Sequence, residues 1–478
     1  MGTITDRNVI EVDFDTDNRA KYIVLESAIR AAITRGDLAP GTRLPPVRDL
    51  AWKIGVTPGT VARAYSRLTD GGVLEAAVGR GTFVAEVTGP APIYREFQAL
   101  EVDSTPHLTG TDETRVVNLL SPHLPSVGQA DLIRRLLGEI AADPPSGMMH
   151  YPSHAAERPA REAVRRFLDH PTLGPLEADD ITLTNGGQHA IGLVMQAVLT
   201  GRRPVVLIEE LTYPGFRRVA EMLRAEVIPV AMDKDGILPD ALEVAARGAD
   251  VQLLCTSPDV HNPTCIATPV ARRREIIEVA RAANIQILED DCYQMQRGDV
   301  DSYRLLAPER TWHVSSIAKT ITPALRLGFA MAPRSHRMAL RRAAEYSSFG
   351  LATPFSDLAA RLFVDPALPG LMAETRDVVG TYVRAAAAIL SDHELHWRDD
   401  VSFLWLILPD GWRASAFCRA AEAAGVKVRA AEEYTGRDAN APHAVRFAVN
   451  SGVSLAIFED AVRRLRRLLD QPPEGLRV

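Results

Sequence analysis

Cysteine is scarce in this chain, and no apolar run is long enough to cross a membrane. The four cysteines among 478 residues lack CxxC spacing. We therefore interpret them as reduced core residues and expect neither a disulfide scaffold nor a metal site. A spanning helix needs roughly 18 consecutive apolar residues, which the chain does not contain, and its acidic first twenty residues hold no signal-peptide stretch. These absences favour a cytoplasmic protein with no membrane partner.

An excess of positive charge is also missing from the chain as a whole. The 54 basic and 61 acidic side chains leave a formal net charge of −7, which excludes a polycation that coats nucleic acid. Hydrophobic residues make up 46% of the chain and charged residues 24%, as in globular proteins. The length predicts about two to four domains. Because the net charge is negative, any DNA-binding domain must occupy a limited part of the chain.

Residues 20–86 differ from the rest of the chain because basic side chains outnumber acidic ones there, nine to six. Apolar residues at helical spacing predict a helix that ends near Gly36 and a short second helix before Gly55. Thr57 and Pro58 are typical of an N-cap and the first residue of a third helix. Two short apolar runs that follow predict a hairpin with its tip at 79–81. The spacing thus predicts a winged helix-turn-helix, either a major-groove reader or a protein-docking module.

The motifs in this region resemble the GntR family of bacterial regulators. They are GTRLPPVRDLA at 41–51, GVTPGTVARAY at 55–65 and GRGTFV at 79–84. The resemblance implies that double-stranded operator DNA is approached by Arg48, Thr57, Gly59, Thr60 and Gly79. Pro58 departs from the polar residue often found there, which puts that base contact in doubt. From charge and expected exposure, Arg63 and Arg80 are further candidates for phosphate contacts, the alternative being solvated surface positions.

Residues 87–115 show no sustained period of 2 or 3.6 and contain scattered proline, glycine and threonine. This composition predicts a linker that separates two folding units. We therefore expect an N-terminal extension at 1–19, the winged helix-turn-helix at 20–86 and a large domain at 116–478.

The large domain alternates short apolar runs with amphipathic stretches, which predicts an α/β fold with a mostly parallel sheet covered on both faces. The seven expected strands lie at 181–183, 205–208, 227–230, 251–255, 285–288, 313–314 and 329–331. Polar motifs follow several of these runs, and ligands of such sheets bind beyond the carboxyl ends of the strands. Lys319 stands in a rather apolar setting, and Asp290 lies at the end of an expected strand, where an isolated carboxylate is costly.

The order of these motifs resembles the fold-type I aminotransferases, which hold pyridoxal 5′-phosphate on a lysine. The matching motifs are TNGGQHA at 184–190, YP at 213–214, HNPT at 261–264, DDCY at 290–293 and SIAK at 316–319. The resemblance implies a smaller C-terminal α+β subdomain and a covalent bond between the cofactor and Lys319. The other implied cofactor contacts are Gly187, Gln188, Ser316 and Arg326 at the phosphate, Asp290 at the pyridinium nitrogen, Asn262 and Tyr293 at the ring 3′-oxygen, and Tyr213 on the ring face.

Two further residues carry implications of this resemblance. Tyr151, in HYP, matches a tyrosine that reaches the phosphate of a neighbouring subunit, which implies a homodimer. Arg446, in VRFAVN, matches the arginine that binds a substrate carboxylate, and a strand-end salt bridge is its alternative role. Ala156 and Ala160 depart from the residues usual in the family, so the loop after Tyr151 is expected to be shaped differently. Ala318 replaces the serine often found just before the lysine.

The two halves together resemble the MocR subfamily of GntR-type transcription regulators. This resemblance implies a regulator that senses an amino acid or amine, which displaces Lys319 and forms an external aldimine. Two alternatives stay open: a true aminotransferase with an attached DNA-binding head, and a regulator that senses pyridoxal 5′-phosphate itself. The identity of the effector, the operator and the sign of regulation have no signal in the sequence.

Overall fold

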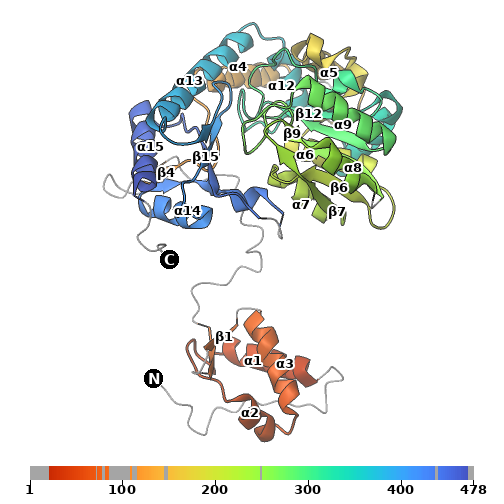
Figure 1. The fold of residues 1–478 in the computed structure, drawn as a ribbon. Coiled ribbons are helices and arrows are strands. Elements are labelled where there is room, and N and C mark those ends of the chain that lie inside the picture. Colours follow the sequence, from red (N-terminus) through yellow and green to blue (C-terminus); the bar gives the residue numbers. More distant parts are fainter. Residues whose placement is uncertain are drawn as a thin grey trace. The chain divides into compact units, whose positions relative to one another are not determined.

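The computed structural model describes residues 21–70, 73–77, 81–85, 108–109, 116–144, 149–247, 250–436 and 440–471 (Figure 1). The chain divides into two compact units, Met1–Glu101 and Val102–Val478. The division falls within the predicted linker. The predicted hairpin tip, with Gly79 and Arg80, lies outside the described residues.

The N-terminal unit is built as the sequence predicts, from three helices and a hairpin. The helices are α1 (Lys21–Thr34), α2 (Val47–Lys53) and α3 (Pro58–Asp70), and the strands β1 (Leu74–Ala77) and β2 (Gly81–Val84) pair antiparallel. One apolar cluster, which includes Leu25, Leu50, Val61 and Leu68, joins all three helices. Thr57 caps α3, because its hydroxyl accepts the N–H of Thr60 at 3.3 Å.

All seven strands expected in the large domain lie in one seven-stranded sheet. Its order is β5 (Ile181–Thr184), β13 (Gly328–Met331), β12 (Thr311–Ser316), β11 (Gln286–Asp290), β10 (Val251–Thr256), β6 (Val205–Glu209) and β7 (Glu226–Val230). Only β13 runs antiparallel to its neighbours. The predicted mostly parallel sheet is therefore confirmed. Strand β11 extends two residues further than expected, to Asp290.

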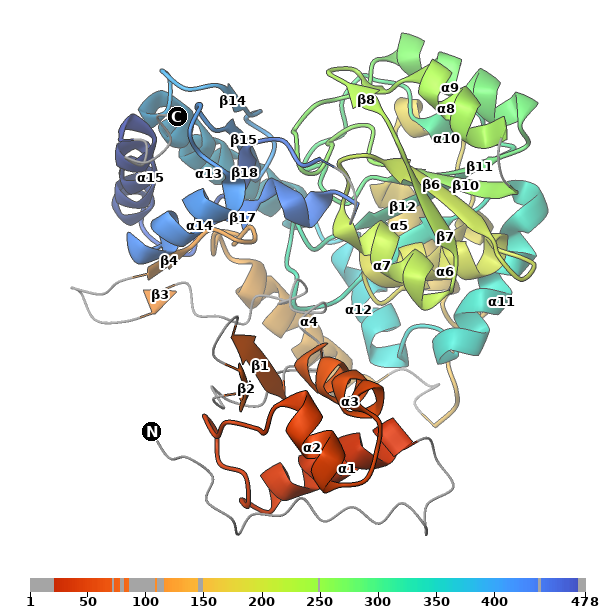
Figure 2. The same cartoon turned by 60° about the horizontal axis from the view of Figure 1, so that its bottom comes forward.

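Helices cover both faces of this sheet, and the side chains of each strand alternate between them (Figure 2). On β11, Leu288 packs toward α6 (Gly187–Val198), α7 (Pro214–Met222) and α11 (Arg337–Ser348). Ile287 packs toward α8 (Pro239–Arg247), α9 (Val270–Ala282) and α10 (Tyr303–Leu306). Asp290 therefore shares the α6 face with Leu288, whereas Glu289 shares the α9 face with Ile287.

A third cluster closes the end of the sheet at β5 and β13. It brings together α4 (Gln129–Ala142), α5 (Arg158–Phe167) and α12 (Thr353–Leu362). The sheet and its helices are accompanied by the hairpin strands β8 (Met232–Asp233) and β9 (Gly236–Ile237), which follow β7, and by 3₁₀ turns at 171–173, 178–180 and 334–336.

The remaining elements form the smaller α+β part that the resemblance implies (Figure 1). Its four-stranded sheet has the order β14 (Leu395–His396), β15 (Phe403–Ile407), β18 (Ala444–Ala448) and β17 (Arg429–Ala430). A second sheet joins β16 (Val426–Lys427), β4 (Val116–Asn118) and β3 (Leu108–Thr109). The helices α13 (Leu368–Ile389), α14 (Ala414–Ala423) and α15 (Leu455–Asp470) pack on them, and a 3₁₀ turn spans Ala431–Tyr434.

One strand of this smaller part lies within the predicted linker. Leu108 and Thr109 form β3, which pairs with β4.

Among the described residues, no helix combines the length and apolar character that a membrane crossing demands.

Candidate functional site

Lys319 lies three residues beyond the end of β12, in the turn that leads to β13. Its side chain is half-buried, and its Nζ lies 5.1 Å from the ring centroid of Tyr293. No ion pair joins it to a carboxylate among the described residues. Burial opposes ionisation of the Tyr293 hydroxyl, but the charges of Lys319 and Arg446 outweigh it and lower the tyrosine pKa. The predicted lysine and tyrosine are therefore brought together.

Asp290 is the last residue of β11 and is buried with only 8% of its surface exposed. Its Oδ1 accepts the N–H of Cys292 at 3.0 Å, and no cation pairs with it among the described residues. Burial raises its pKa to about 6 from the ordinary 3.8. A buried carboxylate without a cation is costly unless a ligand supplies the charge, and a protonated pyridine nitrogen would do so.

A glycine-lined helix N-terminus forms the other end of the site. Helix α6 begins at Gly187 without a side-chain cap, so its first N–H groups stay available for an anion. A Cβ on Gly186 would lie 2.5 Å from Nη2 of Arg326, and one on Gly187 would lie 3.7 Å from Oγ of Ser316. The predicted phosphate residues thus meet at one helix end, where side chains larger than glycine do not fit.

Tyr213 and Gln188 are connected directly, which the sequence did not predict. The Tyr213 hydroxyl donates to Oε1 of Gln188 at 2.8 Å, and burial raises the tyrosine pKa. Gln188 was expected at the cofactor phosphate. Its side chain also fixes the orientation of the aromatic ring that is predicted to cover the cofactor.

Asn262 and Arg446 form a second part of the site. Nη1 of Arg446 donates to Oδ1 of Asn262 at 2.8 Å, while Nδ2 of Asn262 is buried with no hydrogen-bond partner among the described residues. The Arg446 guanidinium lies 4.8 Å from the ring centroid of Phe403 and 5.6 Å from that of Tyr434. The salt bridge that was its alternative role is absent from the described residues. This arginine is therefore a buried cation without a carboxylate.

Two residues near the site carried no recognisable signal in the sequence. Arg429 faces Arg446 across the β17–β18 pair, and its Nη1 binds Glu433 at 2.6 Å. Cys292 lies under the glycine turn, because a Cβ on Gly187 would meet its Sγ at 2.4 Å. It is half-buried, as is Cys418, while Cys255 and Cys265 are buried, and all four are free thiols.

Tyr151 stands apart from the residues described so far. Its side chain is 78% exposed, and its ring packs against Phe349 with the centroids 5.1 Å apart. Nearby, Tyr346 and Phe349 are also exposed. A tyrosine that completes the site of another subunit must reach outward, and this exposure permits that role without testing it.

In the N-terminal unit, the predicted DNA contacts lie at the surface. Arg48, Thr57 and Gly59 are exposed, and Thr60 is half-buried at the start of α3. The Arg63 guanidinium lies 4.3 Å from the ring centroid of Tyr22, and Arg67 binds Glu26 at 2.7 Å. The cationic side chains of α3 are thus partly engaged by α1, whereas Arg48 is an exposed cation at the start of α2.

A search against protein families matches residues 135–465 to aminotransferase class I and II. The chain belongs to this family. Residues 21–84 match the bacterial regulatory proteins of the gntR family. The predicted combination of a GntR helix-turn-helix with an aminotransferase-like domain, typical of the MocR subfamily, is therefore confirmed.

Several relatives carry regulator names. The uncharacterized HTH-type transcriptional regulator YdeF of Bacillus subtilis is 25% identical over 95% of this chain and 96% of its own. The HTH-type pyridoxine biosynthesis transcriptional regulator PdxR of Corynebacterium glutamicum is 28% identical over 65% of each chain. Among solved structures, an aminotransferase of Thermococcus profundus has a TM-score of 0.67 and 19% identity, covering 81% of this chain and 96% of its own. That likeness shows the fold alone.

Proposed function

We propose that this protein is a transcription regulator that binds operator DNA through its winged helix and holds pyridoxal 5′-phosphate at Lys319 to sense an amino compound. The observation that carries the proposal is the pair of unmatched charges at the site. Asp290 is a buried carboxylate without a cation, and Lys319 is an amine without a carboxylate, among the residues that the structure describes. A cofactor with a basic ring nitrogen and an aldehyde would match both.

The other residues fit the remaining groups of this cofactor. The uncapped start of α6, with Ser316 and Arg326, would hold the phosphate. The unpartnered Nδ2 of Asn262 and the Tyr293 hydroxyl would bind the ring oxygen, and Tyr213 would cover the ring. When bound, the cofactor would supply an aldehyde that Lys319 would hold covalently and for which an amino compound would compete.

The class of effector follows from Arg446. A buried guanidinium that lacks a carboxylate among the described residues favours a ligand that brings one. Arg446 would bind the carboxylate bidentately while the amino group of the effector would compete with Lys319 for the cofactor aldehyde. We therefore favour an amino acid over a simple amine as the effector.

The regulator is proposed to act as a homodimer. The exposed Tyr151 and Phe349 would then be covered by the second subunit, and Tyr151 would complete its partner's phosphate site. A change in the body can alter DNA binding only if the effector binds the two arrangements of the dimer with different affinity.

The proposal is tested with the full-length chain and its Lys319→Ala variant. Both are supplied with pyridoxal 5′-phosphate, and DNA is selected by the wild-type protein from a random pool. We expect a cofactor absorbance band and an amino-acid-dependent change in DNA affinity for the wild type only, with unchanged basal DNA binding in the variant. A response that survives in Lys319→Ala would contradict covalent sensing.

Two alternatives each have an observation in their favour. The lysine, aspartate and carboxylate-binding arginine of an aminotransferase are all present, so turnover of an amino acid with a keto acid would identify an enzyme. One relative is named a pyridoxine biosynthesis regulator, so a DNA response to pyridoxal 5′-phosphate alone would identify a sensor of the cofactor.

A further inference from the structure

Arg273 of α9 is fully buried on the face of the sheet opposite the proposed cofactor site. It shares this face with Glu289, whereas Asp290 faces α6. The nearest atoms of Arg273 and Glu289 are 3.9 Å apart. Arg273 contacts none of the described residues that are assigned to the cofactor site, although its neighbour Glu289 directly precedes Asp290 on β11.

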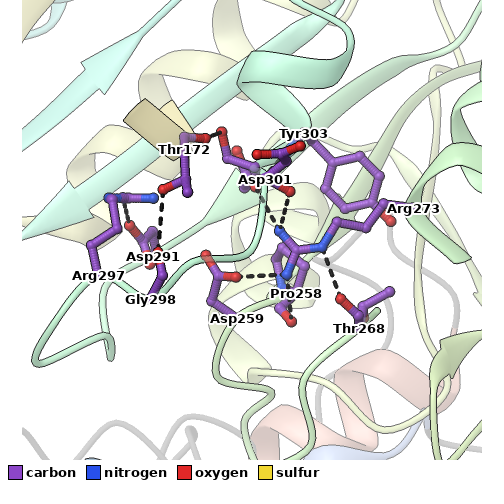
Figure 3. A network of polar contacts seen from close by, with 12 residues as sticks. Thr172, Pro258, Asp259, Thr268, Arg273, Asp291, Arg297, Gly298, Asp301 and Tyr303 are labelled. Carbon is purple, nitrogen blue, oxygen red and sulfur yellow. Dashed lines mark hydrogen bonds and ion pairs between the residues drawn. The ribbon is translucent and has the colours of Figure 1, made fainter. Parts of the chain in front are cut away.

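The guanidinium of Arg273 binds both ends of one loop. Its Nε donates to the carbonyl of Thr268 at 2.9 Å, and its Nη2 donates to the carbonyl of Pro258 at 3.3 Å and to Oδ1 of Asp259 at 2.6 Å. Its Nη1 donates to the carbonyl of Asp301 at 3.0 Å (Figure 3). Residues 258–268 are thereby fastened to a second segment at 301.

The loop fastened in this way is the one that carries Asn262. Its ends are also joined by the backbone bond from Thr268 N to Pro258 O at 2.8 Å. Within it, Cys265 N donates to His261 O at 2.8 Å, and the His261 ring binds the carbonyl of Leu211 at 2.9 Å. The loop that places Asn262 next to Arg446 is thus held at both ends by hydrogen bonds from the Arg273 guanidinium.

A purely packing role does not account for this choice of side chain. Burying a guanidinium is costly, and an apolar side chain of similar volume would often be at least as stabilising. A planar fork of donors can reach three carbonyls and a carboxylate at fixed angles, which a lysine ammonium cannot do. The geometry suits a residue that sets the shape of the loop.

We propose that Arg273 is a positioning residue, which holds the 258–268 loop so that Asn262 meets both the cofactor and Arg446. The inference rests on the proposed cofactor site. Through this loop, Arg273 would affect two properties of the site. These are its affinity for pyridoxal 5′-phosphate and the pKa of the proton held at the lysine–cofactor bond.

The test compares Arg273→Lys with Arg161→Lys in the full-length protein. Arg161 is a matched control, because it is equally buried and donates to the carbonyls of Ala178 at 3.0 Å and His154 at 2.7 Å, away from the loop. Three quantities are measured: amide hydrogen exchange of residues 258–268 without cofactor, the dissociation constant of pyridoxal 5′-phosphate, and the pH midpoint of the bound cofactor's absorbance.

We expect Arg273→Lys to speed exchange in the loop, to weaken cofactor binding about tenfold, the equivalent of roughly one hydrogen bond, and to shift the pH midpoint. Arg161→Lys should lower the melting temperature but leave all three quantities unchanged. If the two variants lose stability alike and leave exchange, affinity and midpoint as in the wild type, Arg273 is a core side chain and the inference is wrong.

Two additions keep the result decisive. In the Asn262→Ala background, Arg273→Lys should cost little further affinity, since both act through the same contact. If Arg273→Lys does not fold, Asp259→Asn, which keeps the size of the side chain and removes its charge, should show the same pattern in weaker form. If it too leaves all three readouts unchanged, the inference fails. A wild type that binds no cofactor would refute the proposed function, whereas the exchange experiment would still test the loop.

Discussion

Arg429 and Arg446 donate to the same backbone oxygen, that of Leu120. Nε of Arg429 lies 3.0 Å from it and Nη2 of Arg446 lies 3.1 Å from it. The two arginines are direct cross-strand neighbours on β17 and β18. Glu433 balances the charge of Arg429, whereas no carboxylate among the described residues balances that of Arg446. The pair therefore offers one neutralised guanidinium and one that can bind a ligand.

This asymmetry predicts different effects of the same substitution at the two positions. Arg446→Lys should weaken binding of an amino acid effector by about 2–3 kcal/mol, roughly 30- to 150-fold, because a bidentate contact is lost in a buried site. Arg429 is already paired with Glu433, so Arg429→Lys should cost no more than about 1 kcal/mol. Titration of cofactor-loaded protein with the amino acid that changes its spectrum most would measure both. Equal losses would show that the two arginines bind the ligand together.

The pKa of Asp290 predicts an unusual stability profile for the cofactor-free protein. This pKa is about 6 when folded, against 3.8 ordinarily. Between about pH 4 and 6 the folded state therefore binds a proton that the unfolded chain releases, so stability falls as pH rises through this window and stays reduced above it. Asp290→Asn should stabilise the apoprotein at pH 7.5 by up to about 2–3 kcal/mol, since each pKa unit corresponds to about 1.4 kcal/mol.

Denaturant unfolding of the apoproteins between pH 4 and 7.5 measures this difference. It should shrink toward pH 4, and the exposed Asp240→Asn should show no such trend. The stabilised Asp290→Asn variant should at the same time bind pyridoxal 5′-phosphate more weakly, because the carboxylate for its ring nitrogen is gone. A variant that gains stability and keeps full cofactor affinity would refute the assigned role.

The sequence predicted the strands and most of the site because their signals are local. Seven apolar runs gave the seven strands of the sheet, and the polar motifs that follow them were expected at its carboxyl edge. Arg429 gave no signal, since its place beside Arg446 depends on the pairing of β17 with β18. The bond between Tyr213 and Gln188, 25 positions apart, likewise depends on how α6 and α7 pack. Contacts made by tertiary packing are what the sequence pattern could not supply.

The glycine turn predicts a pair of compensating substitutions. Gly187→Ala would place a Cβ 2.4 Å from Sγ of Cys292, which is an overlap. The variant should lose about 1–3 kcal/mol of stability, as overpacked sites do, and the α6 N-terminus should bind the cofactor phosphate more weakly. Cys292→Ala removes the sulfur and should restore much of both. Thermal unfolding and cofactor titration of the single and double variants would check this, and additive losses would contradict a direct contact.

Arg48 offers a test of the DNA interface with a matched cation in the same unit. Arg48 is exposed in the first turn of α2, whereas the exposed Arg35 follows α1 and binds Asp37 at 2.9 Å. Arg48→Ala should weaken binding of the selected DNA and lower the slope of log affinity against log salt by about one, since one phosphate contact is lost. Arg35→Ala should leave both unchanged. Because the substitution lies in the N-terminal unit, cofactor binding should also be unaffected. If Arg35→Ala lowers affinity and slope as much as Arg48→Ala, the effect reflects the overall charge of the unit and not a contact made by α2.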